Sequence, residues 1–144
     1  MHILLEGANK KRRSYTLKIE KTAQDYLEAM LMMKESHGYI RSIDVAEKLG
    51  VTKPSVSYTV KRLRENGYLT MDPDGLITLT KEGMDIARKT YERHKTLTLF
   101  LMSIGVDAKT AEDDACKIEH DLSERTYKAL LSHIEKGKTD EVAV

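Results

Sequence analysis

The fold is decided by residues 42–64, SIDVAEKLGVTKPSVSYTVKRLR. Apolar residues recur there at spacings of three and four, which predicts two short helices on either side of Gly50. Glycine can adopt the left-handed conformation that closes the first helix. We expect Ser42 and Thr52 to be the N-caps of the two helices, and Pro54 is tolerated in the first turn of the second. This order of helix, short glycine turn and helix is typical of a helix-turn-helix motif.

The outer face of the second helix carries short hydroxyls, an aromatic ring and cations, which suit contacts to the phosphates and base edges of DNA. These residues are Ser55, Ser57, Tyr58, Thr59, Lys61 and Arg62. Residues 41–64 hold six basic and two acidic side chains, and this balance favours a polyanionic partner. We therefore expect a DNA-recognition helix, with a purely structural helical hairpin as the alternative.

A β-hairpin is predicted directly after this motif. The β-prone residues 68–70 and 76–80 flank the turn Asp72-Pro73-Asp74-Gly75. A hairpin in this position is a wing, so the front of the chain is predicted to be a winged helix-turn-helix. The wing tip carries two aspartates, and their negative charge argues against a strong grip on phosphate.

A helix before the motif is expected from Ile19, with Thr22 as its cap and Gly38 at its end. It carries Asp25 and Glu28 one turn apart, roughly opposite its apolar stripe. Carboxylates on such a face are normally solvated. They gain a role only where another element brings further ligands to them.

The rear of the chain is predicted to be helical throughout. A long helix from Thr80 to about Ser103 places His94 on a mostly apolar stripe, where histidine is more often a hydrogen-bonded core residue than a ligand. Gly105 breaks this helix, an acidic helix follows, and a last helix covers about residues 123–135.

The acidic helix contains Cys116-Lys117-Ile118-Glu119-His120, and Asp107 is its expected N-cap. Neighbours three and four apart share one face of a helix, so a thiolate, a carboxylate and an imidazole are expected to lie together. These are the protein groups that bind transition metals. The alternative is a buried cysteine beside two solvated polar residues.

Composition narrows the class of protein. The 144 residues contain no apolar run long enough to span a membrane, and the single cysteine, which permits no internal disulfide, fits a reducing cytoplasm. The net charge is only +1, but residues 1–20 hold five basic and two acidic side chains, whereas residues 105–125 hold seven acidic and three basic ones. A basic front suits a polyanion, and an acidic rear suits cations.

Together these features resemble the family of metal-dependent repressors that includes the diphtheria toxin repressor and the manganese transport regulator. The similarity runs from about Ala23 to Leu131. Its motifs are Asp25-Tyr26-Leu27-Glu28, Asp44-Val45-Ala46, Val51-Thr52-Lys53-Pro54-Ser55-Val56-Ser57, Leu79-Thr80-Lys81-Glu82-Gly83, Arg93-His94 and Cys116-Lys117-Ile118-Glu119-His120-Asp121-Leu122-Ser123. The resemblance implies the metal ligands Asp25, Glu28, His94, Cys116, Glu119 and His120. It also adds Thr52, Lys53 and Pro54 to the expected DNA contacts.

The chain departs from both branches of that family. It is similar to the iron-responsive branch at Cys116, but that branch has methionine in place of Asp25. It is similar to the manganese branch at Asp25 and Glu28, but that branch has glutamate in place of Cys116. Both branches place a carboxylate where this chain has Thr98, so a second metal is expected to be weak or absent, with Glu112 as a candidate additional ligand. We expect no counterpart of the SH3-like third domain of the iron branch.

We therefore expect a mainly α protein, with an N-terminal winged helix-turn-helix and small β-hairpin wing followed by an all-α metal-binding and dimerisation domain. Residues 1–18 are expected to be a basic tail, 19–88 the DNA-binding domain, 89–138 the helical domain and 139–144 a second tail. The resemblance implies Mn²⁺ or Fe²⁺ as the cofactor, with Zn²⁺ or Co²⁺ binding in vitro.

The expected function is metal-activated repression that controls manganese or iron uptake, by a cytoplasmic homodimer bound to a double-stranded operator and not to a membrane. One alternative is a winged-helix regulator that responds to a small molecule or a protein partner without metal. A more remote alternative is a metal-dependent hydrolase. We do not expect the protein to be an enzyme and assign no catalytic residues, because the sequence lacks a zinc-protease motif, a nucleophile elbow and a phosphate-binding glycine loop.

Overall fold

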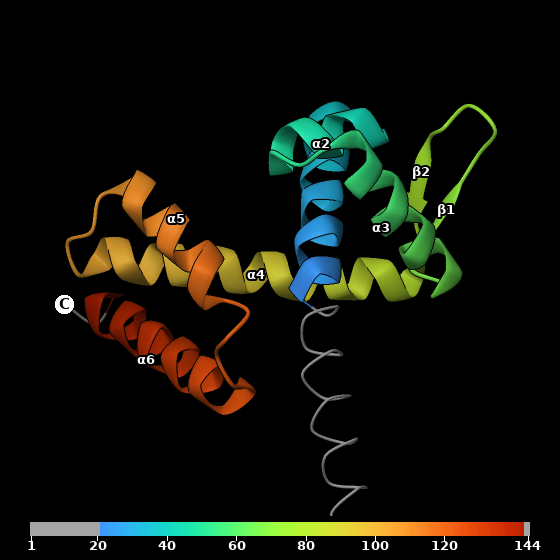
Figure 1. Cartoon of the computed structure of the whole chain (residues 1–144). Coiled ribbons are helices and arrows are strands. Elements are labelled where there is room, and N and C mark those ends of the chain that lie inside the picture. The colour runs from blue at the N-terminus through green and yellow to red at the C-terminus, as the bar shows by residue number, and fades with distance from the viewer. Residues whose placement is uncertain (1–20, 143–144) are drawn as a thin grey trace, which may run out of the picture. The chain divides into compact units, whose positions relative to one another are not determined.

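A computed structural model describes residues 21–142 of the chain, and Figure 1 shows the order of its elements. Residues 21–37 are helical. They are followed by α2 (Ser42–Leu49), α3 (Lys53–Glu65), β1 (Leu69–Met71), β2 (Ile77–Leu79), α4 (Lys81–Ser103), α5 (Ala108–Ile118) and α6 (Glu124–Val142). The prediction of a mainly α protein with one small hairpin is confirmed. The predicted basic tail, residues 1–18, lies outside the described residues.

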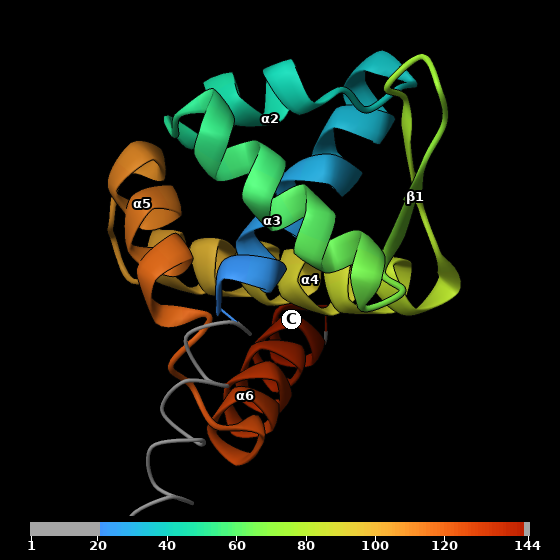
Figure 2. The ribbon, with the colours of Figure 1, turned by 45° about the vertical axis from the view of Figure 1, so that its right-hand side comes forward.

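The chain divides into two compact units, Met1–Arg88 and Lys89–Val144, with the division inside α4. In the first unit, α3 follows α2 after a tight turn, and the hairpin lies beside the end of α3 (Figures 1 and 2). Buried apolar side chains form its core, among them Leu27, Met30, Val45, Val56 and Leu69. No helix of residues 21–142 is long and apolar enough to cross a membrane.

Local capping signals were partly right. Thr52 caps α3 as predicted, because its Oγ1 accepts a hydrogen bond from the Ser55 N–H at 3.3 Å. Gly50 closes α2 with φ of 64°. The prediction for Ser42 was wrong, since Arg41 is the N-cap and makes no side-chain capping bond. The prediction for Thr22 was also wrong, since residue 21 is already helical.

The wing is an antiparallel hairpin in which Leu69 lies opposite Leu79. Asp72 belongs to its turn, because its Oδ1 accepts hydrogen bonds from the N–H groups of Asp74 and Leu76, each at 2.9 Å. Asp72 thus stabilises the turn at the tip of the wing. Arg41 adds an antiparallel bridge to Leu76, so the segment before α2 extends the small sheet.

The second unit consists of α4 from Lys89 onward together with α5 and α6, both of which are inclined to α4 (Figures 1 and 2). Asp107 caps α5 as predicted, because its carboxylate accepts the Thr110 N–H at 3.1 Å. The predicted extent of this helix was wrong, since it ends at Ile118 and Glu119 lies just beyond its last residue. The last helix is longer than predicted and continues to Val142.

Candidate metal centre and nucleic-acid interface

Three predicted ligands come together in the second unit. His94 lies on α4, Cys116 in the last turn of α5 and Glu119 directly after α5. One ligand atom from each lies within 4.8 Å of the other two. A metal ion about 2.0–2.3 Å from each of its ligands can span such a group after small side-chain adjustments. The structure therefore brings the imidazole, thiol and carboxylate to one place, although the helix ends before Glu119.

Glu119 is the centre of this cluster. It is 2% exposed. Its Oε2 lies 3.1 Å from His94 Nδ1, and its Oε1 lies 3.3 Å from His120 Nε2. The contact of Oε1 falls short of a hydrogen bond, and among residues 21–142 this buried oxygen accepts none. A buried carboxylate oxygen without a hydrogen bond is destabilising unless a cation satisfies it. The centre thus fits a bound cation.

The mixture of donor atoms indicates the class of cation. Imidazole nitrogens suit transition metals, a carboxylate suits harder ions such as Mn²⁺, and a thiolate favours softer ones. The His120 side chain is 2% exposed and completes the surroundings of Glu119. Cys116 forms no disulfide and is exposed to solvent. The chemistry therefore fits a divalent first-row transition metal.

Four other positions can be placed. Asp25 and Glu28 lie on the helix of residues 21–37, in the first unit. Asp25 is partly buried, and Glu28 is only 6% exposed, so the expectation of a solvated carboxylate pair was wrong for Glu28. Glu112 is exposed on α5 and is not a member of the group formed by His94, Cys116 and Glu119. The Thr98 Oγ1 donates a hydrogen bond to the His94 carbonyl of the same helix at 2.7 Å.

The outer face of α3 presents the predicted DNA contacts to solvent. The exposed residues are Thr52, Lys53, Pro54, Ser55, Ser57, Tyr58 and Lys61. The Tyr58 ring lies among them, with 61% of the residue exposed. The Thr52 hydroxyl already caps α3, since it accepts a hydrogen bond from the Ser55 N–H and donates one to Ser55 Oγ. Of the outer-face residues predicted from the sequence, Thr59 and Arg62 are only partly exposed.

Sequence reasoning missed two arginine contacts. Arg62 Nη1 donates to the Tyr58 hydroxyl at 2.9 Å, and its guanidinium lies 5.7 Å from the ring centroid. The spacing of four residues was the available signal, since such neighbours meet on a helix. Arg93 donates to the carbonyls of Glu119 and Leu122. Only its position beside His94 in the sequence hinted at this contact.

The two units match two family models. Residues 18–76 match the model described as iron dependent repressor, N-terminal DNA binding domain. Residues 80–142 match the model described as iron dependent repressor, metal binding and dimerisation domain.

Individual relatives give the same picture. The chain is 36% identical over 122 residues to an uncharacterised HTH-type transcriptional regulator of Methanocaldococcus jannaschii, covering 83% of this chain and 98% of that protein. It is 35% identical over 115 residues to the transcriptional regulator MntR of Salmonella typhimurium, covering 80% and 73%.

A solved structure of a manganese-dependent transcriptional repressor in complex with manganese is similar in fold. The TM-score is 0.73 at 29% sequence identity, over 78% of this chain and 52% of that chain. The chain therefore spans about half the length of that repressor.

Proposed function

The chain belongs to the iron-dependent repressor family, and on this premise we propose that it is a metal-activated transcriptional repressor that controls metal-ion homeostasis in the cytoplasm. The observation that carries the proposal is the buried Glu119 carboxylate, which lies between two imidazoles and beside a thiol. This donor set belongs to a chain whose other unit is a winged helix-turn-helix. Members of the family are DNA-binding regulators, so we assign no catalytic role to the cluster.

The proposed ligands are His94, Cys116, Glu119 and His120 of the second unit, together with Asp25 and Glu28 of the first. The assignment of Asp25 and Glu28 to the same site rests on the family resemblance. A bound cation would supply the positive charge that offsets these carboxylates. Because the proposed ligands are drawn from both units, metal occupancy and DNA affinity would be coupled, and each would strengthen the other.

Mn²⁺ or Fe²⁺ is the proposed activator. The carboxylates of Asp25, Glu28 and Glu119 are hard oxygen ligands that suit Mn²⁺, and the imidazoles accept either ion. Cys116 raises the affinity for softer ions, so Zn²⁺ and Co²⁺ would also bind in vitro. Zn²⁺ favours four ligands in a tetrahedron, which would leave part of this set unused. We therefore propose that Zn²⁺ binds tightly and activates poorly.

The proposed DNA contacts lie on α3, whose positive and hydroxyl-bearing face is exposed. Ser57 and Tyr58 would contact base edges, while Lys61 and Arg62 would contact phosphates. A symmetric dimer presents two such helices, and a two-fold operator matches them.

Exposed apolar residues near the end of α4 support a homodimer. Leu99 is 57% exposed, Met102 43% and Ile104 63%. The apolar residues Ala111 and Ala115 of α5 are fully buried within the protomer and are not available to such an interface. We propose that Leu99, Met102 and Ile104 belong to the two-fold interface, where a second copy would cover them.

Selection of DNA from a random double-stranded pool tests this function. The protein is incubated anaerobically with the pool in the presence of Mn²⁺, Fe²⁺, Co²⁺ or Zn²⁺, or with a chelator. A metal-activated repressor enriches a two-fold sequence with Mn²⁺ or Fe²⁺ and not with the chelator. Equal enrichment in the chelator sample would favour the alternative regulator that needs no metal.

A further inference from the structure

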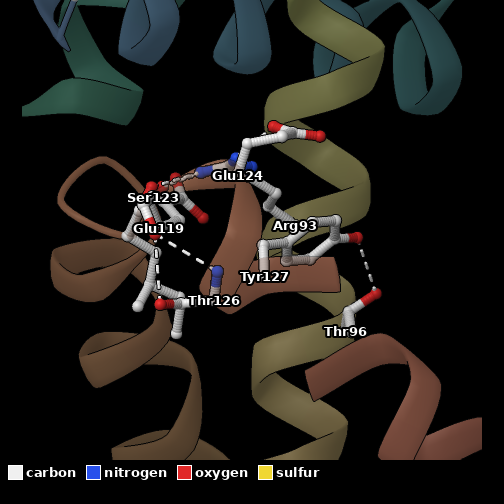
Figure 3. A network of polar contacts seen from close by, with 8 residues as sticks. Arg93, Thr96, Glu119, Ser123, Glu124, Thr126 and Tyr127 are labelled. Carbon is white, nitrogen blue, oxygen red and sulfur yellow. Dashed lines mark hydrogen bonds and ion pairs between the residues drawn. The ribbon is translucent and has the colours of Figure 1, made fainter. Parts of the chain in front are cut away.

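Arg93 makes a network of polar contacts at the end of α5, and Figure 3 shows its side chain directed toward the turn that holds Glu119. Its Nη1 donates to the Glu119 carbonyl at 3.1 Å and to the Leu122 carbonyl at 3.0 Å. These carbonyls lie just past the end of α5, where helical hydrogen bonding stops. Arg93 therefore fixes the backbone of the turn directly after the helix.

The same turn carries the central carboxylate of the proposed metal site. The Glu119 backbone is held by Arg93, and its side-chain Oε2 lies 3.1 Å from His94 Nδ1. Arg93 and His94, two consecutive residues of α4, thus contact the backbone and the side chain of Glu119 respectively. Any rotation of the turn that moved the carboxylate away from His94 would also break the bonds of Arg93.

Further contacts hold the guanidinium in place. Its Nη2 forms an ion pair with Glu124 Oε2 at 2.7 Å, and its carbon lies 4.8 Å from the centre of the Tyr127 ring. The Tyr127 hydroxyl in turn donates to Thr96 Oγ1 at 3.3 Å (Figure 3). Only the planar fork of arginine can donate to two carbonyls and a carboxylate while it stacks on a ring.

The positive charge of Arg93 does not oppose cation binding at the neighbouring site. A bare guanidinium close to a cation site would disfavour binding, but the Glu124 carboxylate balances that charge. The Arg93 side chain is 19% exposed and its two contacts with backbone carbonyls are partly buried, whereas the Glu124 carboxylate is open to solvent. The effect of Arg93 on a nearby ion is therefore geometric, through the position of the turn.

We propose that Arg93 is a positioning residue of the metal centre: it holds the turn after α5 so that Glu119 and His120 stand ready opposite His94. The proposal rests on the proposed function of this cluster. Groups that orient metal ligands typically change metal affinity by about 10–100-fold when they are removed. We expect a loss of that size without any change in the ligands themselves.

The test compares Arg93→Lys with Arg88→Lys in the full chain, because both keep the charge and Arg88 is an exposed arginine on the same helix. Mn²⁺ affinity is measured by calorimetry, the Co²⁺ ligand-field spectrum by absorption, and metal-free stability by thermal melting. Arg93→Lys should bind Mn²⁺ about 10–100-fold more weakly and alter the Co²⁺ spectrum. Arg88→Lys should change neither.

Wild-type affinity and spectrum in folded Arg93→Lys would overturn the proposal, whatever its melting temperature, because a purely structural role moves stability alone. Should Arg93→Lys not fold, Glu124→Gln decides, since it loosens the guanidinium at an exposed carboxylate. A weaker affinity then supports the proposal, and an unchanged affinity overturns it. Glu119→Ala separates the two hypotheses, because unchanged Mn²⁺ binding there would defeat the proposed metal site itself.

Discussion

At the scale of single residues, the sequence identified most of the chemistry but not its surroundings. Cys116 and Glu119 were singled out from residue type and spacing and His94 only from the family resemblance, and the structure brings all three together. The burial of Glu119 and its place beyond the helix were not predictable. The residues that contact Glu119 include Arg93 and His94, which lie more than twenty residues earlier in the chain.

The recognition helix offers a prediction at this scale. Tyr58→Ala removes an exposed ring that also accepts a hydrogen bond from Arg62. We expect it to weaken binding to the selected DNA site by about 1–3 kcal/mol while binding to random DNA changes little. Lys61→Ala should instead weaken both alike and reduce the salt slope by about one. Fluorescence anisotropy over a series of salt concentrations distinguishes the two, and unchanged affinity of Tyr58→Ala would remove that side chain from recognition.

At the scale of elements, short-range signals gave correct answers and longer-range ones did not. The caps Thr52 and Asp107 were predicted correctly because each acts on an N–H only three residues ahead. Ser42 was misassigned because the backbone carbonyl of Arg41 already accepts the first helical bonds, from Asp44 and Val45. The helix α5 ends earlier than predicted, and the turn after it accepts hydrogen bonds from Arg93 of α4, a contact that neighbouring residues in the sequence do not reveal.

The junction between the wing and α4 requires glycine at position 83. A Cβ there would overlap the backbone carbonyl of Tyr68, which cannot move as a flexible side chain does. We expect Gly83→Ala to destabilise the protein by on the order of 1–3 kcal/mol, as overpacking usually does. Gly137→Ala is the control, since its Cβ would meet nothing within 4 Å. Urea unfolding measures both, and equal stabilities of the two variants would contradict the predicted overlap.

The cap of α5 predicts a dependence on pH. The Thr110 backbone N–H, which donates to the Asp107 carboxylate, holds the pKa of that carboxyl below its usual value. A lowered folded-state pKa adds stability above the unfolded pKa of about 3.9, and this stability is lost as pH falls through the folded value. Asp107→Ala should therefore melt at a lower temperature than the wild type near neutral pH, with a gap that closes in acid. A gap that widens in acid would contradict this sign.

At the scale of the whole molecule, family membership confirms the predicted fold and the general function. The sequence could indicate these because its motifs occur in order on separate elements. It could not locate the exposed apolar residues. Helical periodicity predicts which residues share one face of a helix, but it does not predict which other element covers that face. Ala111 and Ala115 are buried inside the protomer, whereas Leu99 and Ile104 are open to solvent.

The proposed dimer yields a prediction at this scale. Leu99→Glu places a charge in the proposed interface, so we expect the protein to sediment as a monomer at micromolar concentration while keeping its helical content. Ile43→Glu is the matched control, because Ile43 is an exposed apolar residue of the other unit and is 50% exposed. It should remain a dimer. A dimeric Leu99→Glu would exclude this surface as the interface.

The central claim is that Glu119 makes DNA binding depend on metal. The most direct measurement is fluorescence anisotropy on the selected two-fold DNA site, titrated anaerobically with Mn²⁺, for Glu119→Ala and for Asp113→Ala, which changes an exposed carboxylate of the neighbouring helix α5. We predict that Asp113→Ala gains DNA affinity with Mn²⁺ as the wild type does, whereas Glu119→Ala gains none. An undiminished response to Mn²⁺ in Glu119→Ala would contradict the account.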